Sequence, residues 1–411
     1  MSASPSGPSL GISTAPLPSL RIGTYEQFLA LLPASLHSAF PGSFTKSSDL
    51  YEELIDRLVL QVFRETGIEP ALREPGTALD IAARVGLEPG RALIPLAWML
   101  RRLALRHAVE EVGEDGPSRR YRACGPLPEL DPAPVRERQR ELDAGWLPSY
   151  AMADIVAEHY PAFLRGELTG EEILFSPARF LRWLDYFSND NSPYAVNNHV
   201  GAVAVLDWLP QGGGVILELG GGLASGAIAV IERLVAAGRL AEVREYRLTE
   251  HVPAFLRRGQ RALTTRFPAA PPLTFGALDM NRPFEEQGVP PGSVTVVYAV
   301  NTLHVAHDLA FTLGEIFRAL APGGQLIASE CVRPWPGQPV YAEFIFNLMA
   351  TFRAPRLHPP WRPNGGFLTA DQWTAAVEAA GFTNVRLLPD ALELRKHFSN
   401  IYVAAVGAAR L

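Results

Sequence analysis

The chain has very little lysine and very little cysteine, and both absences exclude a class of site. Of its 37 basic residues only Lys46 and Lys396 are lysines, and neither belongs to the Gly-Lys-Ser/Thr ending that a P-loop requires. The two cysteines, Cys124 and Cys331, are too few for a disulfide framework or a cysteine-based zinc site. They suit a reducing compartment.

An excess of positive charge and long apolar runs are also missing. The net charge of −6 provides no general attraction to nucleic acid or to an anionic membrane. The longest apolar runs, such as 92–100, fall far short of the ~20 residues of a membrane span, and no charged region followed by an apolar block opens the chain. We therefore expect a cytoplasmic protein with no nucleic-acid or membrane partner.

What is present is enough apolar sequence for two domains. The chain has 411 residues, of which 47% are hydrophobic. Residues 1–20 are rich in Ser, Pro and Gly, which is typical of a disordered tail. We predict a mostly helical domain over 21–130 that serves dimerisation or acts as a lid, a helical connector and lid over 131–210, and a catalytic domain over 211–411.

The first domain has the order of elements of a winged helix. Apolar residues at helical spacing predict helices over 49–65, 77–85 and 91–105, and a hairpin follows over 108–123. Arginines of the third helix and the wing could contact DNA, namely Arg101, Arg102, Arg106, Arg119, Arg120 and Arg122. Because Glu110, Glu111, Glu114 and Asp115 offset them, we favour a packing or dimerising role over DNA binding.

From residue 214 onward the pattern alternates strand and helix, as in an α/β protein with a doubly wound sheet. Strands are predicted at 215–219, 245–249, 273–278, 293–300, 324–330, 384–388 and 399–406. Helices are predicted near 224–237, 252–263, 309–320 and 370–380. Thr369 and Gln372 form a capping box for the last helix, and Gly381 ends it.

A buried strand that runs into three glycines predicts a cofactor site. Val215 to Leu219 leads directly to Gly220-Gly221-Gly222, with Glu218 near the strand end, and glycines allow a ligand to approach the backbone closely. A dinucleotide site would need a further glycine where Ser225 stands. The turn therefore suits a cofactor without a pyrophosphate, such as S-adenosylmethionine.

Acidic residues follow the next two strands. A carboxylate accepts hydrogen bonds from both ribose hydroxyls, so Glu250 is the expected ribose ligand, although a solvated surface acid is the alternative. Asp279 could accept from an adenine amino group while Met280 lies against the ring. Alternatively, Asp279 caps a turn and Met280 belongs to the core.

His304 and Glu330 follow neighbouring strands and should meet at the same edge of the sheet. A carboxylate that binds one imidazole nitrogen fixes the tautomer and leaves the other nitrogen to act as a general base. A purely structural histidine is the alternative, and His307, beside Asp308, is expected to help start the next helix. We expect no metal site, because no further ligands at suitable spacing accompany these residues.

Together these segments resemble class I S-adenosylmethionine-dependent methyltransferases, with a Rossmann-like seven-stranded sheet, and more narrowly the C-methyltransferase domains of polyketide synthases. The resemblance is strongest over 160–167, 218–222, 301–324 and 367–382. It implies that Glu218, Gly220, Gly222, Glu250 and Asp279 hold S-adenosylmethionine and that His304 and Glu330 form the base pair. Met280 and Asn301 are expected to join the cofactor site, and Tyr186, Tyr194 and Asn198 to line the substrate pocket. Ala224, where many members have glycine, and Glu250, in place of aspartate, depart from the family pattern.

The resulting hypothesis is methylation of carbon in a polyketide-like or other small natural product, either free or bound to a carrier protein, by a possible homodimer. Alternatives are O-methylation of a small molecule and a methyltransferase-fold cyclase. A DNA-binding ligand sensor is the alternative outside enzymology.

Overall fold

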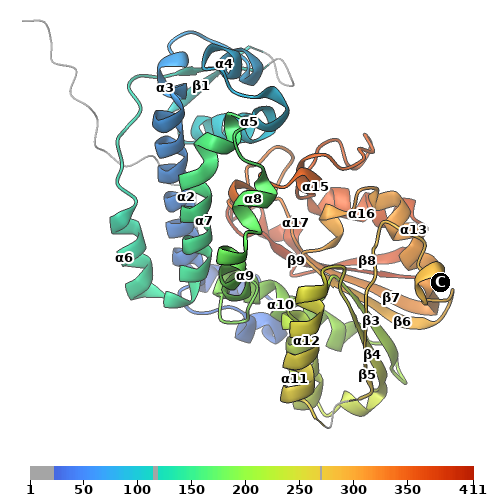
Figure 1. Ribbon diagram of the computed structural model, residues 1–411. Helices are drawn as coiled ribbons and strands as arrows, with labels where there is room; N and C mark the ends of the chain where they lie inside the picture. Colours follow the sequence, from blue (N-terminus) through green and yellow to red (C-terminus); the bar gives the residue numbers. More distant parts are fainter. Residues whose placement is uncertain (1–22, 114–118, 269–270) are drawn as a thin grey trace, which may run out of the picture.

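The computed structural model describes residues 23–113, 119–268 and 271–411 (Figure 1). The predicted disordered tail and the hairpin tip with Glu114 and Asp115 lie outside the described residues. A mostly helical N-terminal part lies beside a sheet domain. The C-terminus of the chain lies near α13 (Leu309–Ala319) in space. The two parts are joined by direct contacts, such as the hydrogen bond from the Ser48 hydroxyl to the carbonyl oxygen of Asn400.

Within the described residues, seven strands form one sheet in the order β5-β4-β3-β6-β7-β9-β8. Neighbouring strands are parallel except that β9 runs antiparallel to both β7 and β8. The strands are β3 (Gly214–Leu219), β4 (Val243–Thr249), β5 (Leu273–Gly276), β6 (Val294–Val300), β7 (Leu320–Cys331), β8 (Thr383–Leu388) and β9 (Val403–Ala409). All seven predicted strands are confirmed, and so is the doubly wound, Rossmann-like fold.

Helices cover both faces of the sheet because successive strand residues point to opposite sides. Ile216 packs into one core with α10 (Ser192–Trp208), α11 (Ser225–Ala236) and α12 (Pro253–Arg266). Its neighbours Val215 and Leu217 pack into a second core with α13 and α16 (Ala370–Ala379). The predicted capping box of Thr369 and Gln372 opens α16, and Gly381 follows it with a φ of 94°.

The N-terminal part is built around two long helices that pack side by side, α2 (Phe44–Thr66) and α7 (Leu147–Leu164). Its first helices are α1 (Tyr25–Ala30), η1 (Ala34–Ala39), α3 (Ile68–Ala71), α4 (Ala78–Arg84) and α5 (Pro89–Leu105), followed by β1 (Val109–Val112) and β2 (Arg120–Ala123). Then come α6 (Ala133–Leu142), η2 (Ala144–Trp146), α8 (Gly170–Leu174), η3 (Pro177–Arg179) and α9 (Phe180–Tyr186). The helices and hairpin expected for a winged helix are present, while that assignment and the boundary near residue 130 stay predictions.

Two of the arginines considered for DNA contact are buried. Arg102 contacts Glu52 and Asp56, each at 2.5 Å, and Arg106 contacts Asp56 at 2.7 Å. These ion pairs fasten α5 to α2, and the Tyr402 hydroxyl, next to β9, donates to Glu52 as well. The alternative that both arginines contact DNA is therefore wrong, because both cations are enclosed between helices, as the favoured packing role would have it.

Short elements connect the rest of the sheet domain. They are η4 (Leu240–Glu242), η5 (Glu285–Gln287), η6 (Leu303–Val305), α14 (Glu343–Phe346), α15 (Ala350–Arg353) and α17 (Ala391–Leu394). None of the helices in the described ranges combines the length and the apolar character needed to cross a bilayer.

Candidate active site

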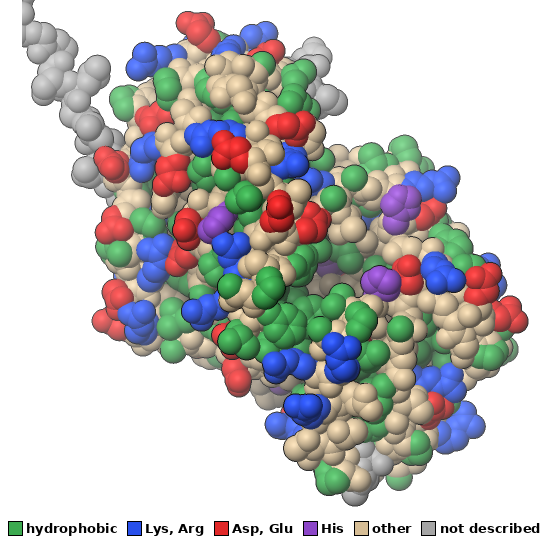
Figure 2. Space-filling view, in the orientation of Figure 1, with side chains coloured by type: hydrophobic (Ala, Val, Ile, Leu, Met, Phe, Trp, Pro, Cys, Tyr) green, Lys and Arg blue, Asp and Glu red, His purple; other side chains and the backbone are tan. Residues whose placement is uncertain are grey.

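A cavity of about 420 Å³ lies between the N-terminal helices and the carboxyl ends of the parallel strands. Figure 2 shows hydrophobic side chains gathered around the hollow between the two parts. Of its wall residues, Phe175, His251, Val252, Asn281 and Thr351 are exposed, so they mark its mouth. Open α/β sheets bind ligands at this edge, at the point where the strand order reverses. Here that point is β3, which has β4 on one side and β6 on the other.

The predicted glycine turn forms part of the cavity wall. Gly220 and Gly222 have φ values of 62° and 51°, in the left-handed region that favours glycine. A side-chain carbon on Gly220 would lie 2.5 Å from the Thr302 methyl carbon, so this position has no room for one. At Gly222 an added carbon would meet only the Gly220 carbonyl oxygen, at 4.0 Å. The missing side chain at Gly222 therefore leaves space for a ligand.

Glu250 lies beside this turn, where the sequence predicts the ribose ligand. Its two carboxylate oxygens accept from the backbone amides of Gly222 at 2.9 Å and Val252 at 2.7 Å. The side chain is 8% exposed and lines the cavity. Each oxygen keeps a further lone pair, so the fixed carboxylate can still accept from a hydroxyl group of a ligand.

Glu218 lies beneath the glycine turn and is not among the residues of the cavity wall. It is 2% exposed and accepts a hydrogen bond from the Tyr246 hydroxyl at 2.8 Å. Burial raises the pKa of its carboxyl group to about 8, although the Tyr246 hydrogen bond lowers it. A direct contact with the cofactor stays a prediction, and the geometry favours support of the turn from below.

Asp279 and Met280 both line the cavity, one strand further from β3. One Asp279 oxygen accepts from the backbone amide of Asn281 at 2.9 Å and from its side-chain amide at 3.0 Å. Asp279 therefore caps a turn, as the alternative reading had it, and also faces the cavity. Met280 packs partly against the core of the sheet.

The structure brings His304 and Glu330 together. The His304 Nδ1 atom lies 2.7 Å from one Glu330 oxygen, and both side chains are buried. The other Glu330 oxygen accepts from the backbone amides of Thr302 at 3.1 Å and Leu303 at 2.8 Å. Glu330 thereby positions both the ring and the turn that carries it. His304 lines the cavity, and its Nε2 atom has no hydrogen-bond partner in the described part of the chain.

Two phenylalanines and an arginine hold His304 from behind. The imidazole ring lies 4.7 Å from the Phe367 ring and 5.9 Å from the Phe352 ring. Arg362 donates to the His304 carbonyl oxygen at 2.5 Å. Burial lowers the pKa of the Arg362 guanidinium to about 10, opposed by the charges of Glu330 and Asp308. The histidine is thus confined to one orientation.

His307 is not part of the cavity wall. Its backbone amide donates to the Asn281 side chain at 2.8 Å. The start of α13 is capped by Asp308, which accepts from the amides of Ala310 and Phe311. Across the described ranges, no three His, Cys, Asp or Glu side chains gather in a way that could hold a metal ion.

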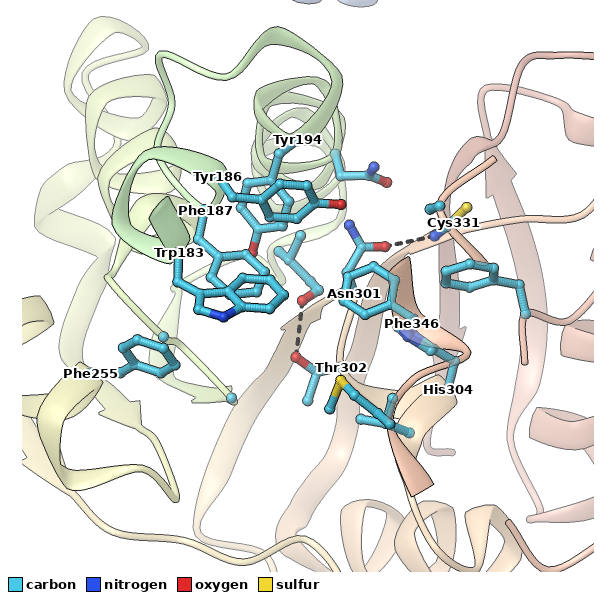
Figure 3. A pocket seen from close by; sticks show the side chains of 18 of the residues that line it. Trp183, Tyr186, Phe187, Tyr194, Phe255, Asn301, Thr302, His304, Cys331 and Phe346 are labelled. Atoms are coloured by element: carbon cyan, nitrogen blue, oxygen red, sulfur yellow. Dashed lines mark hydrogen bonds between the residues drawn. The ribbon is translucent and has the colours of Figure 1, made fainter. Parts of the chain in front are cut away.

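Asn301 lies on the cavity wall, as do Thr302 and His304 (Figure 3). Its φ of 46° is unusual for a residue other than glycine, and such strained backbone often occurs at functional sites. Its side-chain oxygen accepts from the Cys331 amide at 2.8 Å, so the amide group is oriented by β7.

Aromatic residues form the side of the cavity opposite His304 (Figure 3). Tyr186 and Tyr194 are among them, with ring centres 6.2 Å apart. Asn198 is fully buried and donates to the Asn189 side chain, and it is not on the cavity wall. Its neighbour Asn197 is on the wall. The prediction placed the wrong neighbour there, because adjacent helical residues face directions ~100° apart.

Several wall residues were not predicted. They are Trp183, Phe187, Phe255 and Cys331. The dense aromatic run 183–187 was the one available signal.

The comparisons with known proteins agree with this geometry. Residues 245–328 match the family model described as "Methyltransferase domain". The chain also has the fold of the CurJ carbon methyltransferase, with a TM-score of 0.73, 20% identity and coverage of 94% of this chain and 98% of that one. For the CMeT domain of the citrinin polyketide synthase the TM-score is 0.70, with 17% identity and coverage of 95% and 98%.

Curated relatives of the chain are polyketide synthases. It is 27% identical over 284 residues to highly reducing polyketide synthase 2 of Gibberella zeae, and 25% identical over 350 residues to polyketide synthase ThaG of Burkholderia thailandensis. The matches cover 66% and 82% of this chain but only 10% and 6% of those proteins. The prediction of an S-adenosylmethionine-dependent methyltransferase that resembles polyketide synthase C-methyltransferase domains is thereby confirmed.

Proposed function

We propose that the protein methylates a carbon atom next to a carbonyl group in a polyketide-like substrate. The observation that carries this proposal is the buried contact of 2.7 Å between His304 and Glu330 on the wall that faces the glycine turn. A carbon acceptor must lose a proton before it can take a methyl group. A histidine fixed by a carboxylate is suited to remove that proton.

The residues around the cavity fit S-adenosylmethionine. Gly222 leaves room beside the turn, Glu250 offers lone pairs to a ribose, and Asp279 and Met280 lie where the adenine is expected. Bound S-adenosylmethionine would supply an activated methyl group on a sulfonium. The protein itself then has to align the acceptor and exclude water, and the aromatic side chains opposite His304 serve both purposes.

In the proposed reaction the His304 Nε2 atom takes the proton from the acceptor carbon. Because its Nδ1 atom contacts Glu330, the ring keeps its tautomer, and the carboxylate stabilises the imidazolium that forms. Asn301 lines the same cavity as His304, so its oriented amide group could donate to the oxygen of the resulting enolate.

Replacement of His304 tests the assignment. His304→Ala should lower kcat by about 10²- to 10⁴-fold, the usual contribution of a general base, while the Kd for S-adenosylmethionine changes less than about twofold. His307→Ala is the matched control, because this histidine lies three residues further on and outside the cavity wall, and it should retain wild-type kcat. Equal losses of turnover and cofactor binding in His304→Ala would contradict the base role.

The position of the new methyl group distinguishes the alternatives. NMR of the product separates a methyl group on carbon from one on oxygen, and the latter would show O-methylation. A cyclase would convert substrate without accumulating S-adenosylhomocysteine.

The substrate class, partners and location belong to the same proposal. Because curated relatives are polyketide synthases, we propose an acyl substrate that is either free or bound to a carrier protein. A cytoplasmic location and a homodimer stay predictions.

A further inference from the structure

The cavity that contains His304 follows the edge of the sheet across five neighbouring strands. Its wall includes one residue from the end of each strand in the sheet order β4-β3-β6-β7-β9, namely Glu250, Gly220, Asn301, Cys331 and Val403. Val403 belongs to this edge because antiparallel β9 begins opposite Cys331. Neighbouring strands lie ~4.8 Å apart, so the four steps from β4 to β9 span ~19 Å. The cavity therefore extends past the proposed base pair, which lies at β6 and β7.

The part of the cavity near β9 is closed to solvent. We call it the closed end, and its wall residues are Phe44, Tyr51, Ser149, Tyr341, Tyr402 and Val403. All of them except the partly buried Tyr341 are buried. In contrast, the exposed wall residues His251 and Val252 follow β4 at the other end of the row. A ligand that reaches from His304 towards β9 therefore has to end inside the protein.

Three tyrosine rings form the closed end. The centre of the Tyr341 ring lies 4.9 Å from that of Tyr51 and 5.0 Å from that of Tyr402, each in an edge-to-face arrangement. The Tyr51 hydroxyl donates to the Ser149 carbonyl oxygen at 3.0 Å, and the Tyr402 hydroxyl donates to Glu52. Within the described residues the Tyr341 hydroxyl has no hydrogen-bond partner. Tyr341 is thus the ring that can be changed without breaking a hydrogen bond.

The closed end carries no charged side chain. Among the described residues of the cavity wall, the only carboxylates are Glu250 and Asp279, and there is no lysine or arginine. Both carboxylates belong to the part of the wall proposed for the cofactor. An ionised group at the closed end would lose its hydration and find no counter-ion, which is costly. This end of the cavity therefore suits an uncharged, apolar group.

We propose that the closed end binds the apolar chain end of the methyl acceptor and that the Tyr341 ring limits the size of the chain end that fits. The inference rests on the proposed function, which places the reacting carbon between the cofactor and His304. The part of the acceptor on the β9 side of that carbon lies against Cys331 and the tyrosines. Because Tyr51 and Ser149 come from α2 and α7, the N-terminal helices take part in selecting the acceptor.

The test uses acceptors that share the reacting carbon and differ in the chain end. They are the N-acetylcysteamine thioesters of 3-oxobutanoic, 3-oxohexanoic and 3-oxo-5-phenylpentanoic acid, with methyl, propyl and phenylethyl chain ends. Tyr341→Ala should raise kcat/KM for the phenylethyl acceptor, relative to the methyl acceptor, at least about tenfold, because it vacates the space of a ring. Tyr341→Phe keeps the ring and should keep the wild-type order of acceptors. Trp335→Ala removes a ring outside the cavity wall and is the matched control.

A fourth acceptor tests the apolar character of the closed end. The 1-thioester of 3-oxohexanedioic acid has a carboxylate in place of the terminal methyl group of the propyl acceptor. Its kcat/KM should be at least about a hundredfold lower than that of the propyl acceptor, in wild type and in both Tyr341 variants. Equal values for these two acceptors would overturn the inference. So would an unchanged ratio of phenylethyl to methyl acceptor in a folded Tyr341→Ala protein.

Photochemical labelling of the wild-type protein tests the location without turnover and without a variant. The probe is a 3-oxoacyl N-acetylcysteamine thioester whose chain ends in an alkyl diazirine, irradiated in the presence of S-adenosylhomocysteine. Peptide mass spectrometry should find the label on Tyr51, Tyr341 or Tyr402, whereas labelling confined to Phe175 or Val252 at the mouth would overturn the inference. Labelled tyrosines without methylation of any acceptor would refute the proposed function and leave the closed end as a binding site. Methylation of carbon with labelling at the mouth would have the opposite meaning.

Discussion

The buried carboxyl group of Glu218 makes a measurable prediction about pH and stability. Its pKa is raised from 4.5 to about 8, chiefly by burial. A raised pKa means that the folded protein holds a proton that the unfolded chain releases. The contribution of this carboxyl group to stability is therefore fully present below pH 4.5. It is lost as the pH rises towards 8.

The size of the effect follows from the two pKa values. Each unit of pKa shift corresponds to ~1.4 kcal/mol, so the free energy of unfolding should fall by up to about 4 kcal/mol between pH 5 and pH 8.5 through this group alone. This is a large share of the ~5–15 kcal/mol that stabilises a typical protein.

Glu218→Gln should remove this dependence, because the amide keeps the shape and never ionises. Its oxygen can still accept from the Tyr246 hydroxyl. Calorimetric Tm values of wild type and Glu218→Gln, measured from pH 5 to pH 8.5, should diverge as the pH rises, with the variant falling less. Glu137→Gln, on the exposed surface of α6, is the control and should follow wild type. Parallel curves for wild type and Glu218→Gln would refute the assignment of a protonated carboxyl group beneath the turn.

Other variants test the glycine turn and the contact between helices. Gly220→Ala should lower the free energy of unfolding by more than ~1 kcal/mol, because it combines left-handed backbone with a clash against Thr302; urea titration measures this. Gly222→Ala should cost only about 1 kcal/mol in the same titration but should weaken S-adenosylmethionine binding at least about tenfold in calorimetry, since the added methyl group occupies open space beside the turn. Arg102→Met should cost ~3–5 kcal/mol of stability, because Glu52 would stay buried without this partner. A loss below ~1 kcal/mol would show that the network contributes little.

The strands were predictable because their physical signals are local. The predicted strands at 215–219 and 293–300 are short, largely apolar runs bounded by turn residues, and β3 is buried at every position. The chemistry at the edge was predictable for a related reason, since parallel strands bring their carboxyl ends together. His304 and Glu330 are 26 residues apart, yet the strand order alone placed them side by side.

What could not be predicted depends on contacts between distant segments. Whether Asn197 or Asn198 faces the cavity is set by how α10 rotates against β7 and β9, which no spacing within the helix determines. Arg102 looked available for DNA because its partner Glu52 lies 50 residues away on another helix. A cavity of about 540 Å³ is lined by α5, by Tyr121 of β2 and by residues 333–372, and the sequences of these segments carry no sign of their contact.

A last prediction concerns Glu330, whose carboxylate holds both the His304 ring and the turn that carries it. One of its oxygens contacts the His304 ring, and the other accepts from two backbone amides of the turn that carries His304. In Glu330→Gln only one oxygen remains, so either the ring or the turn faces an amide group that donates instead of accepting. The variant should therefore lose at least about tenfold in kcat while S-adenosylmethionine binding is retained, and its stability should fall by ~1–3 kcal/mol, the cost of leaving a buried donor without a partner. Full activity in a correctly folded Glu330→Gln protein would mean that the carboxylate does not support the imidazolium, and the base would then have to be sought elsewhere on the cavity wall.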